Sequence, residues 1–177
     1  MKDKFKRGKW QEFLDWAQNR SLSMLHYCTG CGAIELPPTM TSRYDMSRFG
    51  IGPAATPRQA DLLLVTGYLS TKTLRRLIYT YEQMQEPKFV VGFGSCTING
   101  GMYWDSYNTI KQLDKYLPVE MYIAGCMPRP EAILDGLLEL KNKIENGEAK
   151  GYKEYKENIE FYHKNQEEAL GEVQRTQ

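Results

Sequence analysis

Short apolar stretches alternate with longer amphipathic stretches along most of the chain. The stretch ADLLLVTGY is a near-continuous apolar run, which is typical of strands buried on both faces of a sheet. Gly, Pro or polar residues follow these runs and end them. The pattern predicts four strands, in residues 21–27, 60–68, 88–96 and 119–126.

The amphipathic stretches between these runs predict helices. In residues 70–84, Leu74, Leu77, Ile78 and Tyr81 fall on one face, and either Ser70 or Thr71 is placed to cap the helix. Residues 129–147 predict a helix with Pro130 at its start and Gly147 at its end. We also predict a helix in residues 103–117, and a helix or irregular chain in residues 35–47 that begins at Pro37 and Pro38.

Strands that alternate with helices predict an α/β domain with right-handed crossovers. We therefore expect a flavodoxin-like, doubly wound domain over residues 21–147, with a mostly parallel sheet and helices on both faces. Residues 1–20 predict an amphipathic docking helix, because Phe5, Trp10 and Phe13 fall at helical spacing among basic residues. Residues 148–177 are highly charged and predict a helical or extended tail that lies on a partner or in solvent.

Composition narrows the possible partners and cellular location of the protein. The 177 residues carry a net charge of +1, which gives no electrostatic reason to expect a nucleic-acid partner. No run approaches the roughly 18 apolar residues that span a bilayer, and the basic N-terminus lacks the apolar segment of a secretory signal. We therefore expect the chain in the cytoplasm, where cysteines are usually reduced and serve metal or redox chemistry.

All four cysteines of the chain follow predicted strands. Cys28 and Cys31 come after the first strand, Cys96 ends the third and Cys126 ends the fourth. The carboxyl ends of parallel strands share one edge of a sheet, and ligands bind there in doubly wound folds. The glycine-rich turns GFGSCTINGG and AGCMP allow the backbone to approach a bulky ligand closely. The pattern therefore predicts that the four thiols converge.

Four interpretations of these cysteines compete. Structural zinc usually uses two local cysteine pairs, and here only Cys28 and Cys31 form one. A C-x-x-C dithiol leaves Cys96 and Cys126 without a role, and four unrelated buried cysteines need no shared site. A [4Fe–4S] cluster uses all four thiolates and is the interpretation we favour. Such a cluster carries electrons and leaves no open position for a substrate.

Several segments resemble one protein family. They are CTGCGAIE, SRYDMSRFG, RQADLLLVTG, YEQMQEPKFVVGFGSC and PVEMYIAGCMPRPEAILDGLLELKNKI, within residues 20–146. Together they resemble the small iron–sulfur subunit that respiratory complex I shares with group 4 membrane-bound [NiFe] hydrogenases. The resemblance implies a flavodoxin-like subunit of an oxidoreductase that holds one [4Fe–4S] cluster next to the reduction site and has no substrate site of its own.

The resemblance also assigns expected roles to individual residues. Cys96 and Cys126 match the third and fourth cluster ligands of the family. Glu35 matches the acidic residue that follows the first cysteine pair, and its protonation is expected to respond to the charge of the cluster, unless it only pairs with an arginine or begins a helix. The family's loop that faces the reduction site corresponds in this sequence to Arg43, Tyr44, Asp45, Arg48 and Phe49.

The first cysteine pair departs from both branches of the family. Complex I has C-C-A-I-E, whereas this chain has C-G-A-I-E and Cys28 takes the place of the second cysteine. Group 4 hydrogenases have C-x-x-C but usually continue with C-D-I-E. The combination here resembles the corresponding subunit of the archaeal membrane-bound sulfane sulfur reductase, with a ferredoxin-evolving hydrogenase or a quinone oxidoreductase as alternatives.

The resemblance finally implies the partners and the location. The expected partners are a hydrogenase-like large subunit, a ferredoxin-like two-cluster subunit and a membrane-embedded complex I-like subunit, with ferredoxin as the upstream electron donor. The expected place is the cytoplasmic side of the cell membrane, as a peripheral subunit of an ion-pumping complex. His26, just before the first cysteine, is predicted to be a packed strand residue rather than a ligand.

Overall fold

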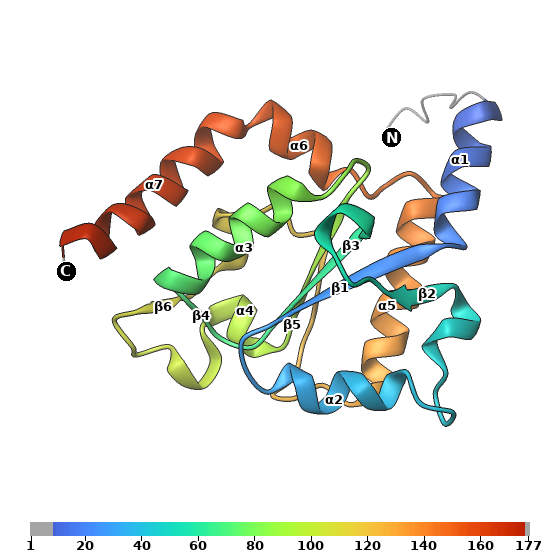
Figure 1. Cartoon of the computed structure of the whole chain (residues 1–177), viewed down its shortest axis with the longest axis horizontal. Coiled ribbons are helices and arrows are strands. Elements are labelled where there is room, and N and C mark those ends of the chain that lie inside the picture. The colour runs from blue at the N-terminus through green and yellow to red at the C-terminus, as the bar shows by residue number, and fades with distance from the viewer. Residues whose placement is uncertain (1–8, 176–177) are drawn as a thin grey trace, which may run out of the picture.

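A computed structural model describes residues 9–175 and contains a central sheet of five parallel strands (Figure 1). The strands lie in the order β2–β1–β3–β5–β7, which is the strand order of flavodoxin. The α/β prediction with a mostly parallel sheet is therefore confirmed. The five strands are β1 (Leu22–Cys28), β2 (Ile51–Pro53), β3 (Leu62–Thr66), β5 (Phe89–Phe93) and β7 (Met121–Ile123).

Within the described residues, seven α-helices and a small second sheet surround these strands. The second sheet pairs β4 (Leu69–Ser70) with β6 (Thr109–Ile110) in antiparallel fashion. The helices are α1 (Lys9–Asn19), α2 (Gly32–Thr39), α3 (Thr71–Gln83), α4 (Ser95–Asn99), α5 (Pro130–Glu145), α6 (Gly151–Glu157) and α7 (Ile159–Arg175). Helices α2 and α5 lie on the face of the sheet opposite α3, as Figure 1 shows.

Alternate residues of the buried strands divide the core into two parts. In β3, Leu62 and Leu64 belong to one hydrophobic cluster, with residues of α2 and α5. Leu63 and Val65 belong to the other cluster, with residues of α3, α6 and α7. This division follows from the two-residue period of a strand, and it explains why β3 and β5 read as unbroken apolar runs.

Two helix boundaries match their sequence signals. Ser70, rather than Thr71, caps α3 and forms a reciprocal capping box with Thr73. Helix α5 begins at Pro130, and Gly147, just beyond its end, has φ +67. At both ends the required backbone geometry selects a particular residue type, so the sequence signal is strong.

Residues 103–117 do not form the predicted helix. They contain turns, β6 and a 3₁₀ turn at Leu113–Lys115. Thr109 and Ile110 pair with β4, and Asn108 accepts a hydrogen bond from the Thr71 amide, 3.3 Å from N to O. Tertiary pairing with a neighbouring segment thus overrides the helical spacing of apolar residues.

The prediction for residues 35–47 was wrong about where the helix begins. Helix α2 begins at Gly32, so Pro37 and Pro38 lie in its second turn. Gly32 packs directly against buried Thr66 of β3, which fixes the start of the helix immediately after Cys31. The sequence analysis also missed β2, because three residues that include Gly52 and Pro53 give no readable pattern.

The N-terminal helix has an uncovered aromatic edge among its described residues. The rings of Trp10 and Phe13 lie 5.8 Å apart, those of Phe13 and Trp16 lie 5.9 Å apart, and all three side chains are exposed. Asn19 Nδ2 donates to Glu145 Oε2 at 2.8 Å and ties the end of α1 to α5. Phe5 lies outside the described residues, and docking by this helix remains a prediction.

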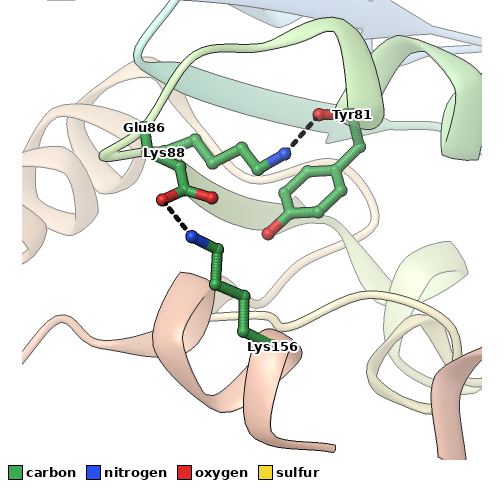
Figure 2. Close-up of polar contacts among 4 residues, drawn as sticks. All are labelled: Tyr81, Glu86, Lys88 and Lys156. Carbon is green, nitrogen blue, oxygen red and sulfur yellow. Dashed lines mark hydrogen bonds and ion pairs between the residues drawn. The ribbon is translucent and has the colours of Figure 1, made fainter. Parts of the chain in front are cut away.

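The C-terminal helices rest against α3 through an aromatic contact. The rings of Tyr81 and Tyr155 meet edge to face, with centroids 5.2 Å apart. Close by, the buried ammonium of Lys88 donates to the Tyr81 carbonyl at 2.8 Å and lies 3.9 Å from the Tyr81 ring centroid (Figure 2). Lys156 forms an ion pair with Glu86 at 2.6 Å, but this pair is largely exposed and contributes little stability.

Buried phenols are expected to make the fold sensitive to alkali. Burial raises the pKa of Tyr122 to about 12, and burial also raises the pKa of Tyr81 and Tyr155. A raised pKa means that the folded state holds the phenol proton more tightly than the unfolded chain does. The full stability is present below pH about 10, the pKa of tyrosine in the unfolded chain, and the free energy of unfolding falls as the pH rises above it. Urea unfolding between pH 8 and 11.5 should show stability falling above pH 10, and Tyr122→Phe should make that fall shallower. An equally steep fall in the variant would contradict the assignment to Tyr122.

Candidate metal centre

The four cysteines lie at one edge of the central sheet. Cys28 is the last residue of β1, and Cys31 immediately precedes α2. Cys96 lies in the first turn of α4, which follows β5, and Cys126 lies three residues after β7. Since these three strands are parallel, their carboxyl ends bring all four cysteines to the same side of the molecule, as the sequence predicts.

Three of the four cysteines line one hollow. It encloses about 540 Å³, a volume that includes the open solvent at its mouth. Its walls come from the loops that follow β1, β3, β5 and β7. They are Gly30, Cys31, Gly32, Gly67, Tyr68, Phe93, Gly94, Ser95, Cys96, Met102, Tyr103, Gly125, Cys126, Met127 and Pro128.

Cys28 lies beside this hollow rather than in its wall. Its thiol donates to the Gly30 carbonyl oxygen, 3.0 Å from Sγ to O. Within residues 9–175, no three Cys, His, Asp or Glu side chains are gathered tightly enough to hold a metal ion as they stand. The backbone therefore places all four cysteines at one edge, while the Cys28 side chain points to its own loop.

Cys96 is the most enclosed of the four thiols. Burial raises its pKa, and negative charge on Cys126 and Cys31 raises it further, while a hydrogen bond from the Met102 amide lowers it. The three thiols thus lie close enough for their charges to repel. The raised pKa disfavours the Cys96 thiolate, and the positive charge of a metal centre would favour it.

Backbone hydrogen bonds hold the cysteine loops to one another. The Gly94 amide donates to the Ile123 carbonyl at 2.8 Å, and the Ser95 amide donates to the Gly125 carbonyl at 2.8 Å. These bonds join the loop of Cys96 to that of Cys126. Gly101, with φ +53, passes so close to Cys96 that an added Cβ would lie 2.9 Å from its Sγ. Close backbone approach around a thiol is what a bulky ligand at this edge requires.

Four other candidate residues lie outside the wall of the hollow. Glu35 is in the first turn of α2, where its charge suits the helix dipole. Arg43 lies over the ring of Tyr44, with 5.4 Å from Cζ to the centroid, and Arg48 lies 4.7 Å from the ring centroid of Phe49. Asp45 has φ +42 and precedes the 3₁₀ turn Met46–Phe49. Among the described residues, no ion pair joins Glu35 to Arg43 or Arg48.

One contact near these residues was not found from the sequence. The Tyr44 hydroxyl donates to Glu131 Oε1 at 2.6 Å, which ties the loop after α2 to the first turn of α5. This hydrogen bond raises the pKa of Tyr44 and lowers that of Glu131. The two residues are 87 positions apart, so only the fold brings them together.

Two aromatic residues of the wall and one histidine complete the site. Tyr68 and Tyr103 line the hollow with their ring centroids 4.7 Å apart. Tyr68 was missed, although it follows the buried strand β3 at the same edge and could have been found by that position. His26 Nε2 lies 2.8 Å from Thr66 Oγ1, and burial lowers the His26 pKa, as expected of a packed strand histidine.

No helix within residues 9–175 is both long and apolar enough to cross a bilayer.

Comparison with known proteins identifies the family. The profile described as "NADH ubiquinone oxidoreductase, 20 Kd subunit" matches residues 28–140. NAD(P)H-quinone oxidoreductase subunit K is 44% identical in Psilotum nudum (84% of this chain, 70% of the relative) and 46% identical in Physcomitrium patens (75% and 51%). The subunit K of Synechococcus elongatus is 47% identical, and the match covers 76% of this chain and 58% of the relative. The matches span 51% to 70% of these relatives' lengths.

A solved structure agrees with this assignment. A chain of the membrane-bound sulfane sulfur reductase, an archaeal respiratory membrane complex, is 61% identical, with a TM-score of 0.87 and 93% of each chain covered. This chain therefore belongs to the family of the 20 kDa subunit of NADH–ubiquinone oxidoreductase, whose members are subunits of oxidoreductase complexes.

Proposed function

We propose that this chain is the electron-transfer subunit of a membrane-bound oxidoreductase of the sulfane sulfur reductase type and holds one [4Fe–4S] cluster. The ligands are Cys28, Cys31, Cys96 and Cys126. The observation that carries the proposal is the gathering of all four cysteines at the carboxyl edge of β1, β5 and β7, three of them around one hollow. The 61% identity to a chain of the sulfane sulfur reductase supports the choice of complex.

The residues at this edge fit such a cluster. Four thiols are the donor set that [4Fe–4S] clusters use, and glycine backbone around the hollow leaves room for a large inorganic group. The Met102 amide donates toward Cys96, and hydrogen bonds of this kind tune cluster potentials. When bound, the cluster accepts and releases single electrons. Binding requires the Cys28 thiol to turn from the Gly30 carbonyl toward the other three.

The surrounding residues support an electron relay rather than substrate chemistry. Buried Phe93 and Pro128 form an apolar part of the wall of the hollow. The Tyr44–Glu131 hydrogen bond holds the loop of Arg43, Asp45 and Arg48 near the start of α5. We propose that this loop faces the reduction site of the neighbouring large subunit, and that Glu35 responds to the charge of the cluster.

The proposed setting is a complex at the cytoplasmic side of the membrane. The partners are a hydrogenase-like large subunit, a ferredoxin-like two-cluster subunit and a membrane-embedded complex I-like subunit, with ferredoxin as donor and sulfane sulfur as acceptor. Support comes from the solved relative, which is an archaeal respiratory membrane complex. The identities of 44–47% to quinone oxidoreductase subunits favour quinone as the second candidate acceptor.

Metal content and electron paramagnetic resonance test the proposal on the intact complex. Iron and acid-labile sulfide should each account for four atoms per copy of this chain beyond those of the other subunits. Dithionite reduction should give one S = 1/2 signal that Cys96→Ser removes or alters. Unchanged signals in the variant, together with zinc that copurifies with this chain, would replace the relay with a structural zinc site.

A further inference from the structure

Two tyrosines from distant segments meet at the mouth of the hollow. We infer that Tyr68 and Tyr103 form an aromatic cover that excludes water from the metal centre and thereby lowers its reduction potential, an inference that rests on the proposed function. Tyr68 lies in the loop between β3 and β4, and Tyr103 ends the 3₁₀ turn that follows α4. Their ring centroids lie 4.7 Å apart, with an angle of 44° between the ring planes.

Each of the two rings lies partly in the wall of the hollow and partly in solvent. Both residues line the hollow together with Cys31, Cys96 and Cys126. The exposed fraction is 38% for Tyr68 and 45% for Tyr103, so one side of the pair faces solvent while the other faces the hollow. Aromatic rings in this position replace water beside the thiols with largely apolar surface.

Tyr68 is anchored to the loop that carries the first cysteine pair. The Thr29 hydroxyl donates to the Tyr68 carbonyl oxygen. The Tyr68 ring also lies against Gly30, where an added Cβ would come within 3.8 Å of Tyr68 Cδ1. Gly67, with φ +82, passes so close to this loop that an added Cβ would lie 2.6 Å from the Gly30 nitrogen. These contacts hold the Tyr68 ring beside the first cysteine pair.

Tyr103 is anchored to the loop that carries Cys96. Its amide donates to the Gly100 carbonyl at 3.0 Å, and the Gly101 amide donates to Asn99 Oδ1 at 2.9 Å. Gly101 packs directly against Cys96, so the turn that ends at Tyr103 is held beside this thiol. The contact between the two rings therefore joins the two cysteine loops across the mouth of the hollow.

The cover acts on the electron affinity of the site. One-electron reduction adds negative charge where four thiolates already make the surroundings negative, and water stabilises the more highly charged form. Exclusion of water therefore lowers the reduction potential, and admission of water raises it. Tyr68 and Tyr103 are positioning residues in this account, because they set the surroundings of the thiols and are not ligands themselves.

Redox titration tests the inference on the full chain, reconstituted with iron and sulfide without oxygen. Tyr68→Ala and Tyr103→Ala should each raise the midpoint potential. Tyr68→Phe keeps the ring and should keep the wild-type potential. The matched control Tyr79→Ala removes an exposed tyrosine of α3 that lies outside the wall, and it should also leave the potential unchanged. Wild-type potentials in both alanine variants at the hollow, or an equal shift in Tyr68→Phe and Tyr68→Ala, would overturn the inference.

Alkylation of the thiols tests the cover without a metal centre. In the chain free of iron, N-ethylmaleimide should modify Cys96 about tenfold faster in Tyr68→Ala than in the wild type, as measured by mass spectrometry of peptides. Cys28 lies outside the hollow and should react at the same rate in both proteins, which also shows that its loop keeps its structure. Equal Cys96 rates would overturn the cover. A wild type that binds no iron, combined with the faster Cys96 reaction in the variant, would refute the proposed cluster and still support the cover.

Discussion

Under the proposed function, Cys96→Ser is expected to lower electron flow from reduced ferredoxin to polysulfide by roughly 100-fold or more. Cys96 is the most enclosed thiol, it is electrostatically coupled to Cys126 and Cys31, and the Met102 amide donates to it. Loss of this residue removes the most enclosed of the four proposed ligands. The rate should be measured on membranes that contain equal amounts of the complex.

Cys28→Ser is the matched comparison, because it makes the same chemical change at the rim of the hollow. The Cys28 thiol is exposed and turned toward Gly30, so its replacement leaves the three thiols that line the hollow in place. We expect this variant to keep a measurable part of the rate and an altered resonance signal. Equal losses of rate in the two variants would contradict the prediction that the enclosed Cys96 matters more for electron flow than the exposed Cys28.

Gly32→Ala is expected to destabilise the folded chain by about 3 kcal/mol. A Cβ at this position would overlap the Cβ and Oγ1 atoms of Thr66, which is fully buried in β3 and bonded to His26. Neither the strand nor the start of α2 can move without displacing Cys31. The free energy of unfolding of the purified chain in urea provides the measurement.

Gly52→Ala serves as the control for this substitution. Gly52 lies in the edge strand β2, and an added Cβ there meets no atom within 4 Å. Its unfolding free energy should change by no more than about 0.5 kcal/mol. If Gly32→Ala were as mild as Gly52→Ala, the contact between α2 and β3 would not set the position of the first cysteine pair.

Several features of this protein are determined by local sequence. Strands β3 and β5 are unbroken apolar runs because both of their faces are buried, and this composition is readable without a structure. The cap at Ser70 and the boundaries at Pro130 and Gly147 are readable for a similar reason, since each depends on the residue's own backbone preference. The position of all four cysteines after parallel strands can be predicted from the same local sequence patterns.

Other features were decided only by the tertiary structure. Residues 103–117 have helical spacing, yet pairing between β6 and β4 turns them into a strand and turns that carry the exposed Trp104 and Tyr107. The contact of Gly32 with Thr66 sets the start of α2, and the Tyr44–Glu131 hydrogen bond joins residues 87 positions apart. Each of these depends on contacts between distant segments, which local periodicity cannot encode. For the same reason, the sequence places Cys28 at the correct edge, while only the fold shows that its side chain lies outside the hollow.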